Sequence, residues 1–212
     1  MNLKRFGNQI EVGCDEAGRG SLSGPVFAAA VILPLNFKNT DLNDSKKLSP
    51  KKREELSKII KKHALAYEIG IVKPKKIDQI NILNASILAM HRAIKKIKIN
   101  YELLLIDGPH FKQFRNKNHK CIIRGDSKFQ AIAAASIIAK TYRDKLMTKL
   151  HNDFPEYKWI SNKGYPTKEH RKAIKNFGIS IHHRKSYKLV NNQMILIILI
   201  TNFEIIFNLL QS

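Results

Sequence analysis

Acidic side chains stand next to turns of small residues at separate places along this chain. Asp15 and Glu16 directly precede a glycine-rich turn, Asp107 precedes a Gly-Pro turn, and Asp126 opens an alanine-rich segment. Carboxylates that converge in one place repel each other and shift toward protonation unless a cation lies between them. Hard oxygen ligands of this kind select Mg²⁺ or Mn²⁺. Two such ions about 3.5–4 Å apart activate a water and clamp a phosphodiester for in-line attack, which makes a two-metal site the prediction for these four acids.

Each acid also has a structural explanation when it is taken singly. Aspartate is common at strand ends, and Asp126 stands where it could cap the helix that follows it. The catalytic interpretation therefore depends on the four acids meeting in space.

The elements that position these acids alternate between strands and helices. The apolar patterning predicts strands over 9–15, 26–33, 65–72, 101–107 and 121–124, and helices over 50–63, 82–97, 126–152 and 167–177. Such alternation is typical of an α/β layered fold. The first two strands have no helix between them, so part of the sheet is expected to be antiparallel and the sheet mixed. In open α/β sheets, ligands bind at the carboxyl ends of the strands, where these acids fall.

The charge of the chain favours a polyanionic partner. There are 38 Lys and Arg residues against 17 Asp and Glu, a net charge of +21, and basic side chains displace the counterions condensed on nucleic-acid phosphates. A solvated lysine coat is the alternative explanation. The two cysteines lack the spacing of a metal site or a disulfide framework, and residues 1–13 lack the apolar core of a secretory signal, so we expect a cytoplasmic location.

Two regions are expected. Residues 1–189 read as a single catalytic domain, and residues 190–212 as an apolar, helical tail. The unbroken apolar run of the tail, 194–200, is shorter than the roughly 20 residues that a membrane span needs. We expect this helix to pack on the body or on a partner chain, with a membrane-surface segment as the alternative.

Several short motifs follow one another in a characteristic order. They are VGCDEAGRG (12–20), GP (24–25), DSKKL (44–48), IDG (106–108), GDS (125–127), AAASIIAK (133–140), KGYPT (163–167) and HRKSY (183–187). In this order they resemble the type 2 ribonuclease H family, ribonuclease HII, over roughly residues 9–189. A tyrosine at position 187, where phenylalanine is frequent, is a small departure.

The resemblance implies a fold and a metal site. The fold is an RNase H-like mixed five-stranded sheet flanked by helices, with a helical C-terminal part. Asp15, Glu16, Asp107 and Asp126 would be the catalytic residues and would bind two Mg²⁺ or Mn²⁺ ions. Asp144 is interpreted as structural.

The resemblance also implies a substrate site. The turn formed by Gly18, Arg19 and Gly20 would read the ribonucleotide, since only the 2′-hydroxyl separates RNA from DNA at a given sugar and glycines let the backbone approach it closely. Tyr165 would stack on the sugar just 3′ of the ribonucleotide, its alternative role being to anchor its loop. Lys46 would contact a phosphate.

Three histidines, His170, His182 and His183, have the residue type of metal ligands. We interpret them as structural or phosphate-facing.

The predicted function is a monomeric endoribonuclease that cuts the RNA strand of RNA–DNA hybrids. It would also incise on the 5′ side of a single ribonucleotide in duplex DNA, leaving a 3′-hydroxyl and a 5′-phosphate. Type 3 ribonuclease H is the nearest enzymatic alternative, but that group carries an extra N-terminal domain and the first strand here starts by about Gln9. A non-catalytic basic nucleic-acid-binding protein is the alternative from another class.

Overall fold

A mixed five-stranded sheet forms the centre of the computed structural model, which describes residues 3–189. The strand order is β3-β2-β1-β4-β5. The first three strands along the chain pair antiparallel, whereas β4 and β5 run parallel to β1. The predicted α/β class and mixed five-stranded sheet are confirmed. The strands are β1 (Glu11–Ala17), β2 (Val26–Ile32), β3 (Ala66–Val72), β4 (Leu103–Asp107) and β5 (Asn118–Ile122).

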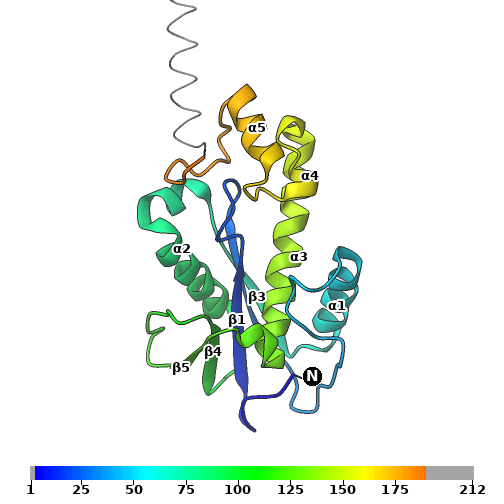
Figure 1. The fold of residues 1–212 in the computed structure, drawn as a ribbon. Helices are drawn as coiled ribbons and strands as arrows, with labels where there is room; N and C mark the ends of the chain where they lie inside the picture. The colour runs from blue at the N-terminus through cyan, green and yellow to red at the C-terminus, as the bar shows by residue number, and fades with distance from the viewer. Residues whose placement is uncertain (1–2, 190–212) are drawn as a thin grey trace, which may run out of the picture.

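Helices cover both faces of this sheet, and Figure 1 shows α2 and α3 on opposite sides of β1. One face packs against α2, and the other against α1 and α3. The predicted helical C-terminal part follows α3 as two short pieces and one longer helix. The helices are α1 (Pro50–His63), α2 (Pro74–Lys96), α3 (Gln130–Asp153), α4 (Trp159–Asn162) and α5 (Lys168–Phe177), with 3₁₀ turns η1 (Gly125–Ser127) and η2 (Pro155–Tyr157).

The strand β2 is buried along its whole length because it has a helix layer on each side. Side chains alternate between the two faces of a strand. Ala28 and Ala30 accordingly pack in the core beneath α2, and Ala29 and Val31 in the core beneath α1 and α3. An unbroken apolar run is what such a strand requires, which explains why its sequence predicted it so closely.

The helix α3 lies unusually close to β1. A Cβ atom at Gly13 would stand 2.1 Å from the carbonyl carbon of Ala131, a distance that no side chain tolerates. Alanines on the facing surface of α3 allow the same approach from the other side. The contact between Gly13 and Ala131 therefore sets how near α3 comes to the strand that carries Asp15.

Three element boundaries differ from the predictions by more than two residues. The strand β5 lies over Asn118–Ile122 rather than 121–124, because an exposed edge strand needs no apolar pattern and its position is set by pairing with β4. The helix α2 begins at Pro74, with a kink at Asn81, whose φ of 61° is non-helical. The side chain of Asn81 accepts a hydrogen bond from the Asn84 amide at 3.0 Å, so the predicted helix over 82–97 corresponds to the segment after this kink.

The third difference concerns α3, which begins at Gln130 and not at Asp126. The predicted tail, 190–212, lies outside the described residues. Across residues 3–189, no helix is both long and apolar enough to cross a membrane.

Substituting Gly13 tests the close approach of α3. Gly13→Ala is expected to destabilise the protein by about 1–3 kcal/mol, because the added methyl group overpacks against the helix backbone. Chemical denaturation measures the change, and Gly7→Ala is the control, since a Cβ at Gly7 meets only Gln9, at 3.9 Å. Equal stabilities of the two variants would contradict the proposed contact.

Candidate active site

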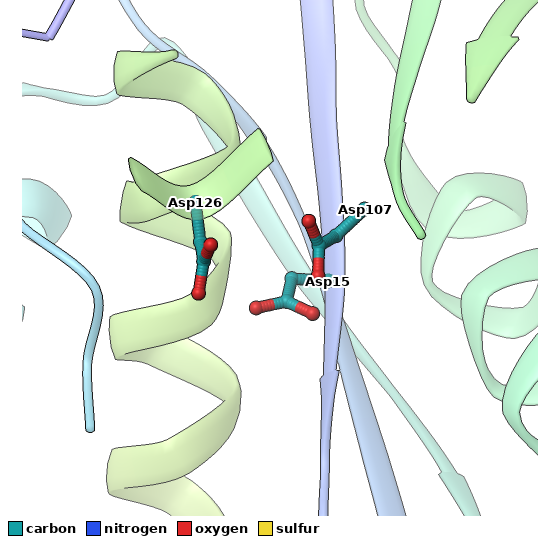
Figure 2. A group of neighbouring side chains, drawn as sticks. All are labelled: Asp15, Asp107 and Asp126. Carbon is teal, nitrogen blue, oxygen red and sulfur yellow. The ribbon is translucent and has the colours of Figure 1, made fainter. Parts of the chain in front are cut away.

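Three aspartates from separate parts of the chain meet at the carboxyl ends of the neighbouring strands β1 and β4. Carboxylate oxygens of Asp15, Asp107 and Asp126 all lie within 4.8 Å of one another, and Figure 2 shows the three side chains pointing toward one another. The parallel register pairs Gly13 with Leu105 and Cys14 with Ile106. Continuing it by one residue brings Asp15 beside Asp107, so the pairing of β1 with β4 positions these two acids.

A short 3₁₀ turn, η1, delivers the third aspartate. Arg124 adopts a left-handed conformation with a φ of 55°, and the chain then turns so that Asp126 is buried against the site. The amide of Gly125 donates to Oδ1 of Asp107 at 2.7 Å, which fastens η1 to the end of β4. The N-cap of α3 is Phe129. Asp126 is therefore not the cap of the long helix, and that structural alternative is wrong.

Glu16 occupies a different position from the three aspartates. Adjacent residues of a strand face opposite sides of the sheet, so Asp15 faces α3 whereas Glu16 faces α2. Glu16 and Asp107 line a common hollow with Met90 of α2, and the Glu16 carboxylate lies 3.4 Å from the guanidinium of Arg19. The structure thus brings three of the four predicted acids into one group and places Glu16 at its rim.

The carboxylates of this site are electrostatically unfavourable to one another. Burial, and then the charges of Glu16 and Asp107, raise the pKa of Asp15 well above its usual range. Burial and the charges of Asp107 and Asp44 raise the pKa of Asp126 to about 6. Burial also raises the pKa of Glu16, against the lowering effect of Arg19. A divalent cation would relieve this repulsion, and an all-carboxylate oxygen set fits Mg²⁺ or Mn²⁺.

The loop that contains Lys46 closes over the same carboxylates. Although burial lowers it, the pKa of Lys46 is raised by the charges of Asp15, Asp44, Asp126 and Asp107. The loop is attached to α3 by a buried hydrogen bond between the hydroxyl groups of Ser45 and Ser136, at 2.8 Å.

Sequence reasoning assigned a role to Lys46 alone within this loop. The structure adds Asp44 as a further acid near Asp126, and Ser136 as a hydrogen-bonding neighbour that lowers the pKa of Asp15. Asp44 lies in the motif DSKKL and Ser136 in the motif AAASIIAK, so these two motifs could have pointed to both residues from the sequence alone.

The glycine-flanked turn is held from behind by two residues, Arg184 and Tyr187, to which the sequence analysis assigned no role. Gly18 has a φ of 95°, a conformation that favours glycine. The buried guanidinium of Arg184 donates to the carbonyl oxygens of Gly18, at 2.7 Å, and of Arg19, at 2.9 Å. The hydroxyl of Tyr187 also donates to the Arg19 carbonyl, at 2.7 Å. The carbonyl groups of Gly18 and Arg19 are therefore both engaged by the surrounding protein.

Tyr165 faces the same hollow as the turn. A cavity of about 390 Å³ is lined by Tyr165, Lys140, all three residues of the turn, and the site residues Glu16, Lys46 and Asp107. The cationic groups of Lys140 and Arg143 each lie 5.3 Å from the centre of the Tyr165 ring. A second hollow, of about 630 Å³, continues on the other side of Tyr165 and Lys140 and is lined by further basic residues, Arg53, Lys145 and Lys163.

The remaining candidate residues have structural surroundings. Asp144 forms ion pairs with Lys140, at 2.6 Å, and with Arg53, at 3.3 Å, in agreement with its structural interpretation. His170 and His183 are buried, and His182 is partly buried. Among the residues that the structure describes, the group able to hold a metal ion contains the three aspartates and no histidine.

A mixed sheet in this order, with acids gathered where two parallel neighbours end, defines a nuclease of the ribonuclease H type. More narrowly, the chain belongs to the ribonuclease HII family, whose model matches residues 12–190. The chain is 57% identical to the ribonuclease HII of Christiangramia forsetii over 193 residues, covering 91% of this chain and 98% of the relative. These matches confirm the resemblance and show a type 2 ribonuclease H.

Solved structures agree with this assignment. Ribonuclease HII in the PCNA:RNase HII complex from Archaeoglobus fulgidus superposes with a TM-score of 0.73 at 27% identity, covering 86% of this chain and 96% of that one. Bst-RNase HIII in complex with Mn²⁺ has the same fold, with a TM-score of 0.72 at 16% identity over 91% of this chain and 71% of that one.

The raised pKa of Asp126 predicts a pH-dependent cost to the metal-free fold. This loss of folding free energy is absent below pH 3.8, the ordinary pKa of an aspartate. It grows as the pH rises and is complete above about pH 6, the raised pKa of Asp126. Without divalent cations, Asp126→Asn is therefore expected to raise the melting temperature at pH 8 and to raise it less at pH 5.

Calorimetry in a chelating buffer measures this effect. Asp153→Asn makes the same charge change at an exposed position and is expected to give no such gain. A variant at position 126 that is less stable than the wild type at pH 8 would contradict the proposed repulsion.

Proposed function

We propose that this ribonuclease hydrolyses the RNA strand of RNA–DNA hybrids and incises on the 5′ side of single ribonucleotides in duplex DNA, leaving a 3′-hydroxyl and a 5′-phosphate. The observation that carries the proposal is the common hollow described above. It places Glu16 and Asp107, two of the four acids, next to a backbone turn suited to reading a sugar and next to Tyr165. A cleavage site and a sugar-reading site within one hollow is what incision at a ribonucleotide requires.

The acids act by holding divalent metal ions. We propose Asp15, Asp107 and Asp126 as ligands, with Glu16 joining from the opposite face of β1 at the rim. When bound, Mg²⁺ or Mn²⁺ ions in such a site activate a water and stabilise the leaving oxygen. The protein supplies the positions of these ligands, through the β1–β4 pairing and through the hydrogen bond from Gly125 to Asp107.

The turn contributes hydrogen-bond donors for the ribose. The carbonyl oxygens of Gly18 and Arg19 already accept hydrogen bonds from Arg184, whereas no backbone acceptor within residues 3–189 takes the amides of Arg19 or Gly20. A Cβ at Gly20 would meet no atom within 4 Å, so this side of the turn is open to a ligand. We propose that these amides donate to the 2′-hydroxyl oxygen, which a deoxyribose lacks.

Tyr165 and the basic residues around it are proposed to receive the DNA on the 3′ side. The tyrosine ring stacks on the sugar that follows the ribonucleotide, where a deoxyribose fits and a ribose would crowd. Beyond it, the hollow lined by Arg53, Lys145 and Lys163 offers cations to the phosphates of that strand. Lys46 contacts a phosphate near the acids.

The non-catalytic alternative is less well supported by the geometry. A protein that binds phosphates with lysines has no use for three converging carboxylates, two of them buried, because these repel a polyanion unless cations lie between them.

A duplex that carries one ribonucleotide provides the direct test. With Mg²⁺ or Mn²⁺, the protein is expected to cut once on its 5′ side, and Asp15→Asn to abolish cutting while the duplex is still bound, because the lost charge is a metal ligand and not a phosphate contact. Gel analysis of the labelled strand measures incision, and fluorescence anisotropy measures binding. Folded wild-type protein that binds the duplex without cutting it would support the non-catalytic alternative.

Removing the Tyr165 ring tests the stacking role. Tyr165→Ala is expected to reduce the preference for a deoxyribose over a ribose at the following position roughly fivefold, the equivalent of about 1 kcal/mol for a lost aromatic contact. Tyr165→Phe is the matched control and should keep the preference. Competition between the two substrates gives the ratio directly, and an unchanged ratio in the alanine variant would remove the ring from this role.

A further inference from the structure

A chain of buried hydrogen bonds ends on the backbone of Tyr165. Nδ1 of His170 lies 2.9 Å from the carbonyl oxygen of Tyr165. On the other side of the ring, Nε2 of His170 lies 3.1 Å from Nε1 of Trp159 and 3.2 Å from Nε2 of His183. All three of these aromatic side chains are buried. They belong to the C-terminal part of the fold, around α4 and α5, which Figure 1 shows at one end of α3.

The partners fix the protonation of both histidines. The Ser180 amide donates to Nδ1 of His183 at 2.9 Å, so His183 carries its proton on Nε2 and donates it to His170. The single lone pair of Nε2 of His170 is then shared by the donors Trp159 and His183 in a three-centre hydrogen bond, which leaves Nδ1–H of His170 to donate to the Tyr165 carbonyl. Burial lowers the pKa of both rings, to about 4 for His183, in agreement with two neutral imidazoles.

Other contacts tie the same loop to the ribose-reading turn. The carbonyl oxygen of Gly164 accepts from the Leu22 amide at 2.8 Å. Arg143 lies beneath the Tyr165 ring and donates to the carbonyl oxygen of Lys163 at 2.9 Å. The same guanidinium fills the place of a side chain at Gly18, since a Cβ there would stand 2.0 Å from its Nε. The loop is thereby held relative to the turn. Within it, the Tyr165 amide donates to the Asn162 carbonyl at 2.9 Å and the Tyr165 carbonyl accepts from the Thr167 amide at 2.8 Å, so His170 supplies the second donor, and the side-chain one, to that carbonyl oxygen.

We propose that His170 is a positioning residue for junction selection, held in the required tautomer by His183 and Trp159. It fixes the peptide of Tyr165 so that the ring meets the sugar after the ribonucleotide. This inference rests on the proposed function of Tyr165. It differs from a packing role for a buried aromatic cluster because it depends on one N–H group, which isosteric substitutions can keep or remove.

Two variants at one position separate the alternatives. In His170→Asn the side-chain amide nitrogen takes the place of Nδ1 and still donates to the Tyr165 carbonyl, whereas in His170→Gln the amide reaches the Nε2 position and that donor is lost. The measurement is the ratio of kcat/KM for a duplex with a deoxyribose after the ribonucleotide to that for one with a ribose there, with the melting temperature followed in parallel.

The glutamine variant is expected to lower this ratio about fivefold, the equivalent of one lost hydrogen bond of about 1 kcal/mol, and the asparagine variant to keep the wild-type ratio, since its donor remains. His182→Gln, a neighbouring histidine outside the chain of hydrogen bonds, is the control and should leave the ratio unchanged. An unchanged ratio in His170→Gln, or an equal loss in either His170→Asn or the control, would overturn the proposal.

Two further results keep the test decisive. If the glutamine variant does not fold, Trp159→Phe removes one of the two donors to His170 and keeps an aromatic ring; the ratio should then fall about twofold, for a partial loss of the restraint, and an unchanged ratio would overturn the proposal. A wild-type protein without preference between the two substrates would instead reject the proposed role of Tyr165, so the two failures are distinguishable.

Discussion

Mutual repulsion among converging carboxylates is the constraint on which the rest of this structure depends. Three acids within 4.8 Å of one another raise each other's free energy when ionised, so the fold must hold them together against that force. It does so with the most rigid elements available: two parallel strands supply Asp15 and Asp107, and a 3₁₀ turn hydrogen-bonded to Asp107 supplies Asp126. The close packing of α3 on Gly13 belongs to the same solution, since it fixes the depth at which Asp15 lies.

Hydrogen bonds from two buried arginines hold the loops that surround the three aspartates. Arg143 and Arg184 are both fully buried, and within residues 3–189 neither forms an ion pair with an acid. Each donates instead to several backbone carbonyl groups of neighbouring loops. Because a guanidinium offers five donors in a fixed planar geometry, one side chain can set the relative positions of several loops. Guanidinium groups that face carbonyl groups and tyrosine side chains leave the nearby carboxylates free to bind cations.

Much of this arrangement was predictable from sequence, and the exceptions have physical causes. The interior strands were found because each is covered by helices and must be apolar. The edge strand β5 and the start of α3 were misplaced because neither position is marked by an apolar pattern. The separation of Glu16 from the three aspartates follows from strand alternation once β1 is seen to extend beyond position 15. The roles of Arg143 and Arg184 were missed, and the histidines were interpreted only as structural or phosphate-facing, because a sequence does not distinguish a buried polar side chain from a solvated one.

The contact between Gly18 and Arg143 has a consequence for how such an enzyme changes over time. The absent side chain at position 18 makes room for a guanidinium that also touches Tyr165, so a substitution in the turn displaces the support of a residue 147 positions away in the chain. On the roles proposed for the turn and for Tyr165, sugar discrimination at the ribonucleotide and at its neighbour is therefore inherited together. We therefore expect a redesign that relaxes one of them to need compensating replacements at both ends of this contact, because a side chain at position 18 would collide with Arg143.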